Sequence, residues 1–369
     1  MITRGQLLSA SKKCKRGVSW KSSTQMYYMK RLAWISDTLT KIENKTYKPK
    51  RQKIFKIHER GKVRLIKANH ISDRVVQKAY NENILKPALY PHLIYDNAAS
   101  QEGKGTEFCL QRLKHHLRTY YIHHGNYGYV LLIDFSNYFG NIDKNILLDR
   151  IEPRIKDADD FDLLKVLMRG DTEGLGLGSE INQTGAIFYT SGLDHFIKEK
   201  LHIKHYLRYM DDLILIHESR DYLESCFSEI MKVCDSLNIV VNIRKCKIIN
   251  LKSDWFVYLK KKVRLTDSGH IIMKPVNKNI QARRKKIKHQ YDLFLQGLMP
   301  IDSIIQSYIS WRGYALKYDI SYNQLIGMDY LFRRLFGRSA THIVLSKFKG
   351  GEKHEREVTR RFHEGIQDI

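Results

Sequence analysis

The sequence predicts an α+β protein, with helices on one face of an antiparallel sheet and a helical region after it. Short apolar runs, such as residues 130–133, have the length of buried strands. Apolar residues recur at helical spacing between these runs, and from about Pro275 onward the pattern is that of amphipathic helices. At 369 residues the chain is long enough for a large core and for two or three subdomains.

The charge of the chain favours a polyanionic partner. Lysine and arginine total 64 residues against 39 acidic residues, so the formal net charge is +25. The basic residues are spread along the chain and interleaved with 22 tyrosines, which favours nucleic acid over a membrane surface. There is no run of about 18 apolar residues, and the first residues lack the apolar core of a signal peptide. We therefore expect a cytoplasmic protein with no membrane partner.

Neither the cysteines nor a histidine cluster indicates a metal site. The cysteines are odd in number and lack C-x-x-C spacing, so we expect reduced packing residues. They are Cys14, Cys109, Cys226, Cys234 and Cys246. Four histidines could hold a metal, but no acidic or cysteine ligand is near them in the sequence, which favours a basic helix face along a phosphate backbone. They are His115, His116, His123 and His124.

The first predicted elements are a hairpin and two helices in a basic region. Residues 47–69 suggest a hairpin that turns at residues 59–61. Ser72 and Asp73 are expected to cap a helix whose apolar residues follow helical spacing. A second helix is expected at residues 106–125.

A buried strand and a glycine-rich loop follow. The apolar run 130–133 ends in Asp134 and is typical of a central strand buried on both faces. Residues 144–168 are expected to be helical. Residues 174–183 (GLGLGSEINQ) form a glycine-rich loop that leads into a helix at 184–201.

The next region predicts a tight hairpin, a helix and a closing strand pair. Strands at 206–208 and 213–216 are expected to pair, with residues 209–212 at the bend. A helix capped by Ser219 is expected to run to residue 237, followed by a strand at residues 239–250 that pairs with a strand at residues 255–265. Three amphipathic helices then extend to residue 337, and no element is predicted beyond it.

Three carboxylates are predicted to lie close together at the edge of this sheet. Asp211 and Asp212 occupy one bend, and Asp134 ends a neighbouring strand. At the effective dielectric of a protein edge, they would repel one another by a few kcal/mol unless a cation lay between them. Two Mg²⁺ ions bound through oxygen ligands would meet this need and would serve phosphoryl transfer. The alternative is that Asp211 and Asp212 are simply favourable turn residues.

The surrounding motifs resemble a known family. The sequence YMDD between apolar strands, preceded by a strand ending in DFSNYF and by a G-x-x-x-N-Q loop, resembles the palm of reverse transcriptases. The resemblance runs from about Arg64 to Leu335 and implies a right-hand polymerase with an antiparallel palm sheet and a helical thumb. The implied parts are an N-terminal segment with fingers at 1–128, a palm at 129–265 with fingers helices at about 144–175, a thumb at 275–337, and a basic tail at 338–369.

The resemblance also implies catalytic and metal-binding residues. It makes Asp134 the first metal ligand, together with the backbone carbonyl of Phe135. Asp211 is the second metal ligand, and Asp212 beside it is also implied to bind metal. Lys245 corresponds to the lysine that can protonate the leaving pyrophosphate, although Cys246 stands where threonine is usual. A solvated lysine is the alternative. The other two residues of the YMDD motif, implied to contact nucleic acid, are Tyr209 and Met210.

Further residues are implied to bind the incoming nucleotide. Phe139 corresponds to an aromatic steric gate that excludes a ribose 2′-hydroxyl, and an ordinary core phenylalanine is the alternative. Candidates for gripping the triphosphate are Arg64, Lys67 and Arg74, and Lys104 corresponds to a phosphate contact in a template loop. The loop that supports the nascent base pair has Leu177-Gly178 where Q-G is common, and it continues to Asn182-Gln183 where Ser-Pro is common.

The implied function is an RNA-directed DNA polymerase that copies a dedicated, structured noncoding RNA into cDNA. It would use deoxynucleotides and two Mg²⁺ ions, for which Mn²⁺ could substitute, and an accessory protein or a second copy of the chain as partner. The departures at Leu177 and Gln183 resemble diversity-generating retroelement enzymes and several bacterial groups near them, including defence-associated and abortive-infection types. Antiviral defence is the leading interpretation of this resemblance. One alternative is an error-prone diversity-generating retroelement enzyme, and another is a non-catalytic RNA-binding scaffold with a polymerase-like palm.

Overall fold

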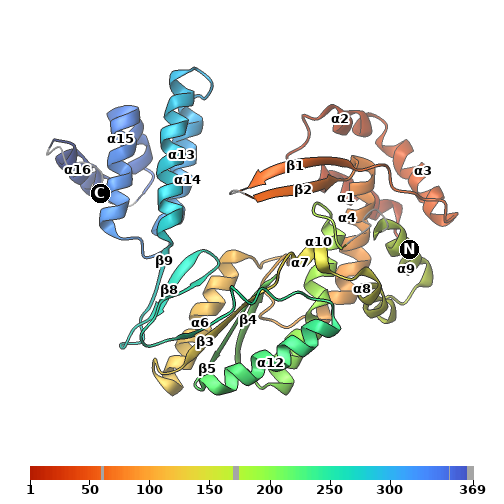
Figure 1. The fold of residues 1–369 in the computed structure, drawn as a ribbon. Helices are drawn as coiled ribbons and strands as arrows, with labels where there is room; N and C mark the ends of the chain where they lie inside the picture. Colours follow the sequence, from red (N-terminus) through yellow and green to blue (C-terminus); the bar gives the residue numbers. More distant parts are fainter. Residues whose placement is uncertain (60–61, 169–173, 349, 364–369) are drawn as a thin grey trace. The chain divides into compact units, whose positions relative to one another are not determined.

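The chain forms two compact units in a computed structural model, Met1–Asn250 and Leu251–Ile369. The structure describes residues 1–59, 62–168, 174–348 and 350–363 (Figure 1). Across these residues, no helix is both long enough and apolar enough to cross a membrane. All five cysteines are free thiols and only Cys246 is not fully buried, so their predicted role in packing is confirmed.

The first unit begins with three helices and the predicted hairpin. Its antiparallel strands are confirmed, and the predicted turn residues 60 and 61 lie outside the described part of the chain. These elements are α1 (Arg4–Cys14), α2 (Ser22–Met29), α3 (Arg31–Glu43), β1 (Lys53–Glu59) and β2 (Lys62–Ala68).

The helix after the hairpin, α4 (Ile71–Tyr80), is not capped as predicted. His70 is its N-cap, and the His70 ring accepts a hydrogen bond from the backbone N–H of Ser72. Asp73 is instead buried, where it accepts hydrogen bonds from the Tyr47 hydroxyl at 2.9 Å and the Lys50 backbone N–H at 3.0 Å. A capping position would leave this carboxylate in solvent, whereas here it fixes the chain leading into the hairpin.

The remaining helical segments of the first unit agree broadly with the prediction. The helix expected at 184–201 begins earlier, at Glu180, so Asn182 and Gln183 are helical rather than part of the loop. The segments are a π-helix at Asn81–Leu85, α5 (Lys86–Leu89), a 3₁₀ turn at Tyr90–His92, α6 (Thr106–His124), α7 (Tyr138–Asn141), α8 (Lys144–Ile151), a 3₁₀ turn at Glu152–Arg154, α9 (Ala158–Met168), α10 (Glu180–Tyr189), α11 (Ser191–His195), a π-helix at Phe196–Lys200 and α12 (Arg220–Ser236).

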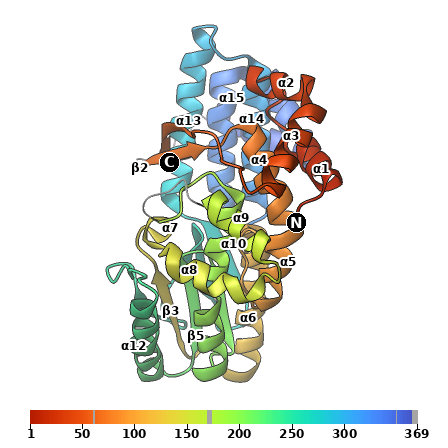
Figure 2. The same ribbon diagram turned by 90° about the vertical axis from the view of Figure 1, so that its right-hand side faces the viewer.

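A four-stranded antiparallel sheet forms the centre of the first unit. Its strand order is β4 (His205–Tyr209), β5 (Asp212–His217), β3 (Tyr129–Asp134) and β6 (Lys247–Asn250). Residues 213–216 are all at most 2% exposed, although successive strand residues point to opposite faces. Figure 2 shows the strands between α12 and α6. Helices therefore cover both faces, and the expectation of one covered face is wrong.

The histidine cluster on α6 does not form the uniform basic face that was expected. His116 is 7% exposed, and its Nε2 lies 3.1 Å from a carboxylate oxygen of Asp96. His124 pairs with Glu218 at 2.7 Å. Both acidic partners are distant in sequence, which is why the local pattern did not reveal them.

The strand pair predicted within residues 239–265 does not form. β6 pairs with β3, whereas β7 (Phe256–Tyr258) pairs with β8 (Lys261–Leu265) in the second unit. A third strand, β9 (Ile271–Pro275), completes that smaller antiparallel sheet. The first predicted strand is extended only at Lys247–Asn250, and the second is divided into β7 and β8 by a turn at Leu259 and Lys260, which both have positive φ. Apolar pattern alone does not choose a strand's partner.

Helices make up the rest of the second unit. The Tyr308 ring stacks on Phe332 with ring centroids 4.2 Å apart, and the buried Asp329 accepts a hydrogen bond from the Tyr308 hydroxyl at 2.7 Å. Gly337, at φ +83°, kinks the longest helix where the prediction ended it. The helices are α13 (Asn277–Leu295), α14 (Ile301–Leu316), α15 (Tyr322–Leu345) and α16 (Gly351–His363).

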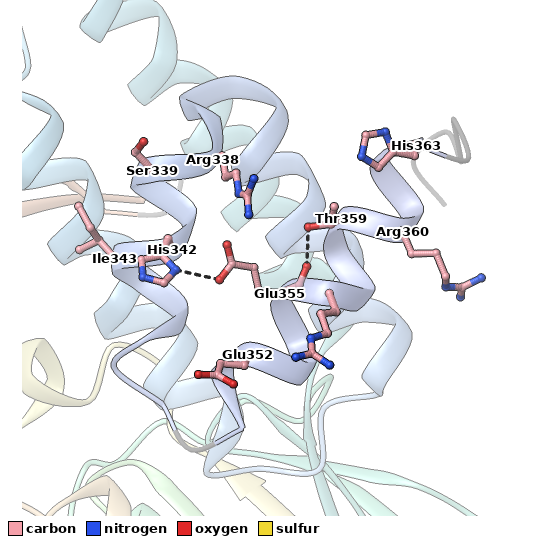
Figure 3. Close-up of a pocket in the computed structure, with 10 residues that line it drawn as sticks. Arg338, Ser339, His342, Ile343, Glu352, Glu355, Thr359, Arg360 and His363 are labelled. Atoms are coloured by element: carbon pink, nitrogen blue, oxygen red, sulfur yellow. Dashed lines mark hydrogen bonds and ion pairs between the residues drawn. The ribbon is translucent and has the colours of Figure 1, made fainter.

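A pocket of about 870 Å³ lies between the end of α15 and α16 (Figure 3). His342 Nδ1 lies 2.9 Å from Glu355 Oε2 across it. Arg338, Arg356 and Arg360 also line the pocket. The C-terminal region, for which the sequence predicted no element, is therefore partly helical and carries both signs of charge.

Candidate active site

Strand register brings two of the three predicted carboxylates together. Asp134, the last residue of β3, is the direct cross-strand partner of Asp212, the first residue of β5. Met210 and Asp211 form the two-residue turn before it, and Met210 adopts a left-handed conformation at φ +55°. The Phe135 backbone N–H donates to the Asp211 carbonyl at 3.1 Å. This bond fixes the turn beside the end of β3, so the three aspartates share one edge of the sheet.

Lys245 occupies this edge. It lies in the turn before β6, and its Nζ is 2.7 Å and 2.8 Å from the two carboxylate oxygens of Asp134. Hydrogen bonding to Asp134 raises the pKa of Lys245, and the charges of Asp212 and Asp211 raise it further. The ammonium group is therefore held in the field of all three carboxylates.

The donor set fits a hard divalent cation, although the side chains are not arranged as a closed ligand group. Among the residues that the structure describes, no three acidic, histidine or cysteine side chains lie close enough together to hold an ion. The carboxylate oxygens are the ligands that Mg²⁺ prefers. The Lys245 ammonium contacts both carboxylate oxygens of Asp134, so this edge of the sheet binds a positively charged group.

Backbone contacts connect the steric-gate candidate to the glycine-rich loop. Phe139 lies on α7, half-buried against the core, and its carbonyl accepts a hydrogen bond from the Leu175 N–H at 2.7 Å. A Cβ atom on Gly174 would lie 2.2 Å from the Gly140 carbonyl oxygen, so only glycine permits this close approach. The loop is thereby held against the segment that carries Phe139.

The same loop continues to the hairpin formed by β1 and β2. The Lys67 backbone N–H on β2 donates to the Leu177 carbonyl at 3.2 Å. Gly178 has φ +121°, and a Cβ atom there would lie 2.9 Å from the Lys67 carbonyl oxygen. Three predicted nucleotide-binding positions, Phe139, Leu177-Gly178 and Lys67, are therefore linked through backbone contacts.

The backbone contacts that link this group do not include three other predicted residues, whose role in nucleotide binding stays a prediction. Arg74 is exposed on α4, within electrostatic range of the Cys14 thiol of α1. Gln183 lines a separate pocket of about 430 Å³ with Lys78 and Gln101. Arg64 lies on β2, and its side chain is outside the described part of the structure.

Lys104 is engaged with its own loop. Its Nζ donates to the carbonyls of Tyr95 at 2.8 Å and Asn97 at 3.1 Å, and burial lowers its pKa. These bonds hold the segment that runs alongside β4. The structure thus gives Lys104 a positioning contact, and its predicted phosphate contact stays a prediction.

The remaining predicted residues lie around the turn. Tyr209 is half-buried, and its hydroxyl accepts a hydrogen bond from the Thr106 hydroxyl at 3.4 Å. Met210 is half-buried at the tip. The Phe135 side chain is 2% exposed in the core, which leaves only its backbone to serve as a ligand.

Sequence reasoning missed a buried ion pair behind the turn. Arg208 and Asp194 are both fully buried, with Arg208 Nε and Nη2 each 2.7 Å from an Asp194 oxygen. Burial lowers the pKa of Arg208, but the Asp194 carboxylate outweighs it and raises that pKa. Arg208 Nη1 also donates to the Met210 carbonyl at 3.1 Å. An arginine inside an otherwise apolar strand was the available signal, because such a residue must be paired.

The second unit carries a cluster of cations that the sequence also did not single out. Lys262 on β8 and Lys274 on β9 are direct cross-strand partners. Their Nζ atoms lie 5.0 Å and 4.8 Å from the centroid of the Trp255 ring, and the Arg264 guanidinium lies at 5.9 Å. Like charges placed opposite each other destabilise a sheet, so this arrangement favours an anionic ligand.

The three aspartates lie where neighbouring antiparallel strands end, and a glycine-rich loop joins the segment after β3 to the β1–β2 hairpin. This arrangement is typical of the palm of a polymerase. Residues 48–288 match the family of reverse transcriptases (RNA-dependent DNA polymerases). The match covers more than half of the chain, and the chain belongs to this family. It is therefore an RNA-directed DNA polymerase, a nucleotidyltransferase with the predicted right-hand fold, and enzymes of this family use divalent metal ions.

The solved structures that match the chain include telomerases. One, from Candida albicans with a TWJ fragment of telomeric RNA, is 12% identical and has a TM-score of 0.49, over 93% of this chain and 71% of that chain. An apo telomerase from Candida tropicalis is 13% identical with a TM-score of 0.49, over 88% and 67% of the two chains. None of the curated protein sequences matches the chain.

Proposed function

We propose that the chain copies one structured noncoding RNA into cDNA with two Mg²⁺ ions. The observation that carries this proposal is the register that pairs Asp134 with Asp212 and sets Asp211 in the adjoining turn. Mn²⁺ accepts similar oxygen ligands and would substitute for Mg²⁺. Asp134, Asp211 and the Phe135 carbonyl would hold the ions, with Asp212 beside them.

When bound, the two ions neutralise the phosphates and stabilise the attacking and leaving oxygens of an in-line displacement. Lys245 holds a proton at Nζ, and its raised pKa keeps the ammonium charged at neutral pH. This proton would pass to the departing pyrophosphate. Before nucleotide binds, Lys245 partly neutralises Asp134 and limits the repulsion among the carboxylates.

Selection of deoxynucleotides is assigned to the group linked through Phe139. The Phe139 ring would exclude a ribose 2′-hydroxyl, and the Leu177-Gly178 backbone would support the nascent base pair. Lys67 is proposed to contact the triphosphate, together with Arg64 and Arg74. The hydrogen bonds of Leu175 to Phe139 and of Lys67 to Leu177 support this grouping.

The proposed biological role is antiviral defence. It rests on the departures at Leu177 and at Asn182-Gln183, where the chain resembles defence-associated enzymes rather than the commoner reverse transcriptase pattern. The same departures fit an error-prone enzyme of a diversity-generating retroelement, which is the second candidate. A non-catalytic RNA-binding scaffold is the third, and the shared carboxylate edge disfavours it because a scaffold does not need mutually repelling charges.

Sequencing the RNA and DNA that copurify with the native chain tests the proposal. An Asp211→Asn, Asp212→Asn double variant serves as the control. DNA complementary to one bound RNA, present only with the native aspartates, is the expected result. Substitutions concentrated at template adenines would favour diversification, and one bound RNA without DNA in cells challenged with phage would favour the scaffold.

A further inference from the structure

Exposed aromatic rings lie on the N-terminal helices and on the turn between α1 and α2, and the polymerase site does not use them. The Trp20 side chain is 73% exposed, and its indole N–H donates to the Gly17 carbonyl at 3.3 Å. That bond holds one edge of the indole in place and leaves the ring open to solvent. Met29, in the last turn of α2, is 82% exposed.

Basic side chains accompany these rings. Lys15 Nζ lies 5.1 Å and the Arg31 guanidinium 5.8 Å from the centroid of the Tyr28 ring. Lys21 Nζ lies 5.4 Å from the Trp20 ring. The same pairing recurs on α3, where Lys50 Nζ lies 4.8 Å from the Trp34 ring.

A pocket of about 470 Å³ opens beside Tyr28. Lys15, Ser19, Thr24, Gln25 and Met29 line it together with Tyr28. It therefore combines a cation, an aromatic ring, a flexible thioether and polar groups. Such a mixture suits a planar, polar ligand with a nearby negative charge, which describes a nucleotide within a strand.

These helices are firmly attached to the first unit. α1 buries Leu7, Ala10 and Cys14, and the Cys14 thiol donates to the Arg74 carbonyl of α4 at 3.6 Å. The Tyr28 hydroxyl donates to the Ser11 carbonyl, which joins α2 to α1. Figure 2 shows α1, α2 and α3 side by side. The exposed rings thus stand on a fixed support.

The charge of this region matches a polyanion. Residues 1–52 contain 13 lysine and arginine residues and only two acidic residues, Asp37 and Glu43. Few acidic groups are present here to pair with basic residues of a protein partner. A phosphate backbone, in contrast, could contact a cation beside each aromatic ring. Aromatic rings between cations are the usual arrangement for binding single strands, because every base can stack.

We propose that α1, α2 and α3 form a second RNA site, here named the N-terminal stacking surface (Lys15, Trp20, Lys21, Tyr28 and Arg31), which binds a single-stranded segment of RNA. The choice of RNA over DNA rests on the proposed function, since the template is RNA. The surface would hold an unpaired segment outside the palm, with bases on Trp20 and Tyr28 and phosphates beside Lys15, Lys21 and Arg31.

The test is RNA binding by the full chain with its palm already filled by an RNA–DNA hybrid. A fluorescein-labelled 12-nucleotide oligo(U) reports binding by anisotropy, in EDTA and without nucleotides, so the result does not depend on polymerase activity. Trp20→Ala is expected to weaken binding about tenfold, within the range for loss of one stacked base. Lys15→Gln should weaken it and flatten the salt dependence by about 0.7 in the logarithmic slope.

Tyr127→Ala removes another exposed aromatic ring, 65% exposed beyond the end of α6, and is the matched control. It should leave oligo(U) binding unchanged. Crosslinking of 4-thiouridine RNA to residues within 15–31 would support the site directly. Unchanged binding in Trp20→Ala, equal loss in the control, or tighter binding of duplex RNA than of oligo(U) would overturn it. A change of oligomeric state in Trp20→Ala would instead indicate a protein interface and would also overturn it.

Discussion

The Lys245 ammonium contacts both carboxylate oxygens of Asp134, at 2.7 Å and 2.8 Å. A divalent cation and this ammonium cannot occupy the same side of one carboxylate. In the proposed mechanism, Lys245 would release Asp134 as metal and nucleotide bind, and it would then be free to reach the leaving phosphate. The contact would belong to the site before nucleotide binds.

Replacing Lys245 should separate these two roles. Lys245→Gln is expected to lower the maximal rate of nucleotide addition about 100-fold, the low end for loss of a general acid. It should also lower the Mg²⁺ concentration needed for half the maximal rate, since the competing ammonium is gone. Both quantities come from single-nucleotide extension at varied Mg²⁺. Lys247→Gln, an exposed lysine two residues away, is the control, and an unchanged rate in Lys245→Gln would contradict the assignment.

Local pattern was sufficient to predict the catalytic hairpin. The apolar run before Asp134 and the two runs around Asp211-Asp212 each carry their own strand signal, and a two-residue turn forces the second pair to be antiparallel. The register of that pair follows from the turn, because a two-residue loop fixes which residues lie opposite each other. The pairing of β3 with β5, which places Asp134 opposite Asp212, is given by the structure and not by the apolar pattern, because both strands are buried on both faces.

Contacts distant in sequence could not be predicted in the same way. Arg208 of β4 pairs with Asp194 of α11 because the fold packs these two segments together. The sequence of neither segment predicts which residue is the partner. The pairing of β6 with β3, and not with the strand that follows it, is likewise a choice among several apolar runs. His70 became the cap of α4 because Asp73 was drawn into a buried contact with Tyr47.

The Arg208–Asp194 pair is predicted to support both stability and the shape of the catalytic turn. Arg208→Met leaves the buried Asp194 carboxylate without its counter-charge, although the Tyr206 hydroxyl still donates to it at 2.6 Å. The change should cost about 3–5 kcal/mol in the free energy of unfolding. An Arg208→Met, Asp194→Leu double variant should recover much of that loss in urea unfolding. Its activity should stay low, because the Met210 carbonyl has lost its hydrogen-bond donor. Full activity in a stable double variant would show that the guanidinium does not position the turn.

Phe139 is predicted to exclude ribonucleotides. Phe139→Ala should raise the ratio of ribonucleotide to deoxynucleotide incorporation at least tenfold, because a clash worth about 1.4 kcal/mol or more is removed. Phe227→Ala, which truncates another half-buried phenylalanine packed on the same core, controls for loss of packing. The measurement is competitive incorporation on one template. If the native chain and Phe139→Ala gave the same ratio of ribonucleotide to deoxynucleotide incorporation, Phe139 would be an ordinary core residue and not a steric gate.

Lys262 and Lys274, the paired cations on the sheet of the second unit, are predicted to lower stability and to increase affinity for nucleic acid. Lys274→Gln relieves repulsion from its cross-strand partner Lys262, so the temperature of unfolding should rise slightly. Affinity for a primer–template duplex should fall, and the logarithmic salt slope should decrease by about 0.9 for one lost phosphate contact. Lys278→Gln removes an exposed charge from α13 without relieving that pair and should not raise the unfolding temperature. A Lys274→Gln variant that binds duplex normally would refute the phosphate contact.

Primer extension on a defined RNA template with Mg²⁺ tests the central claim most directly. The native chain should extend a DNA primer, and Asp134→Asn and Asp211→Asn should each reduce the rate about 1,000-fold or more while remaining folded, since several kcal/mol of charge stabilisation is lost. Asp235→Asn, which alters an exposed aspartate on α12, should extend normally. Extension by either folded Asp134→Asn or Asp211→Asn at the native rate would contradict the carboxylate-centred mechanism.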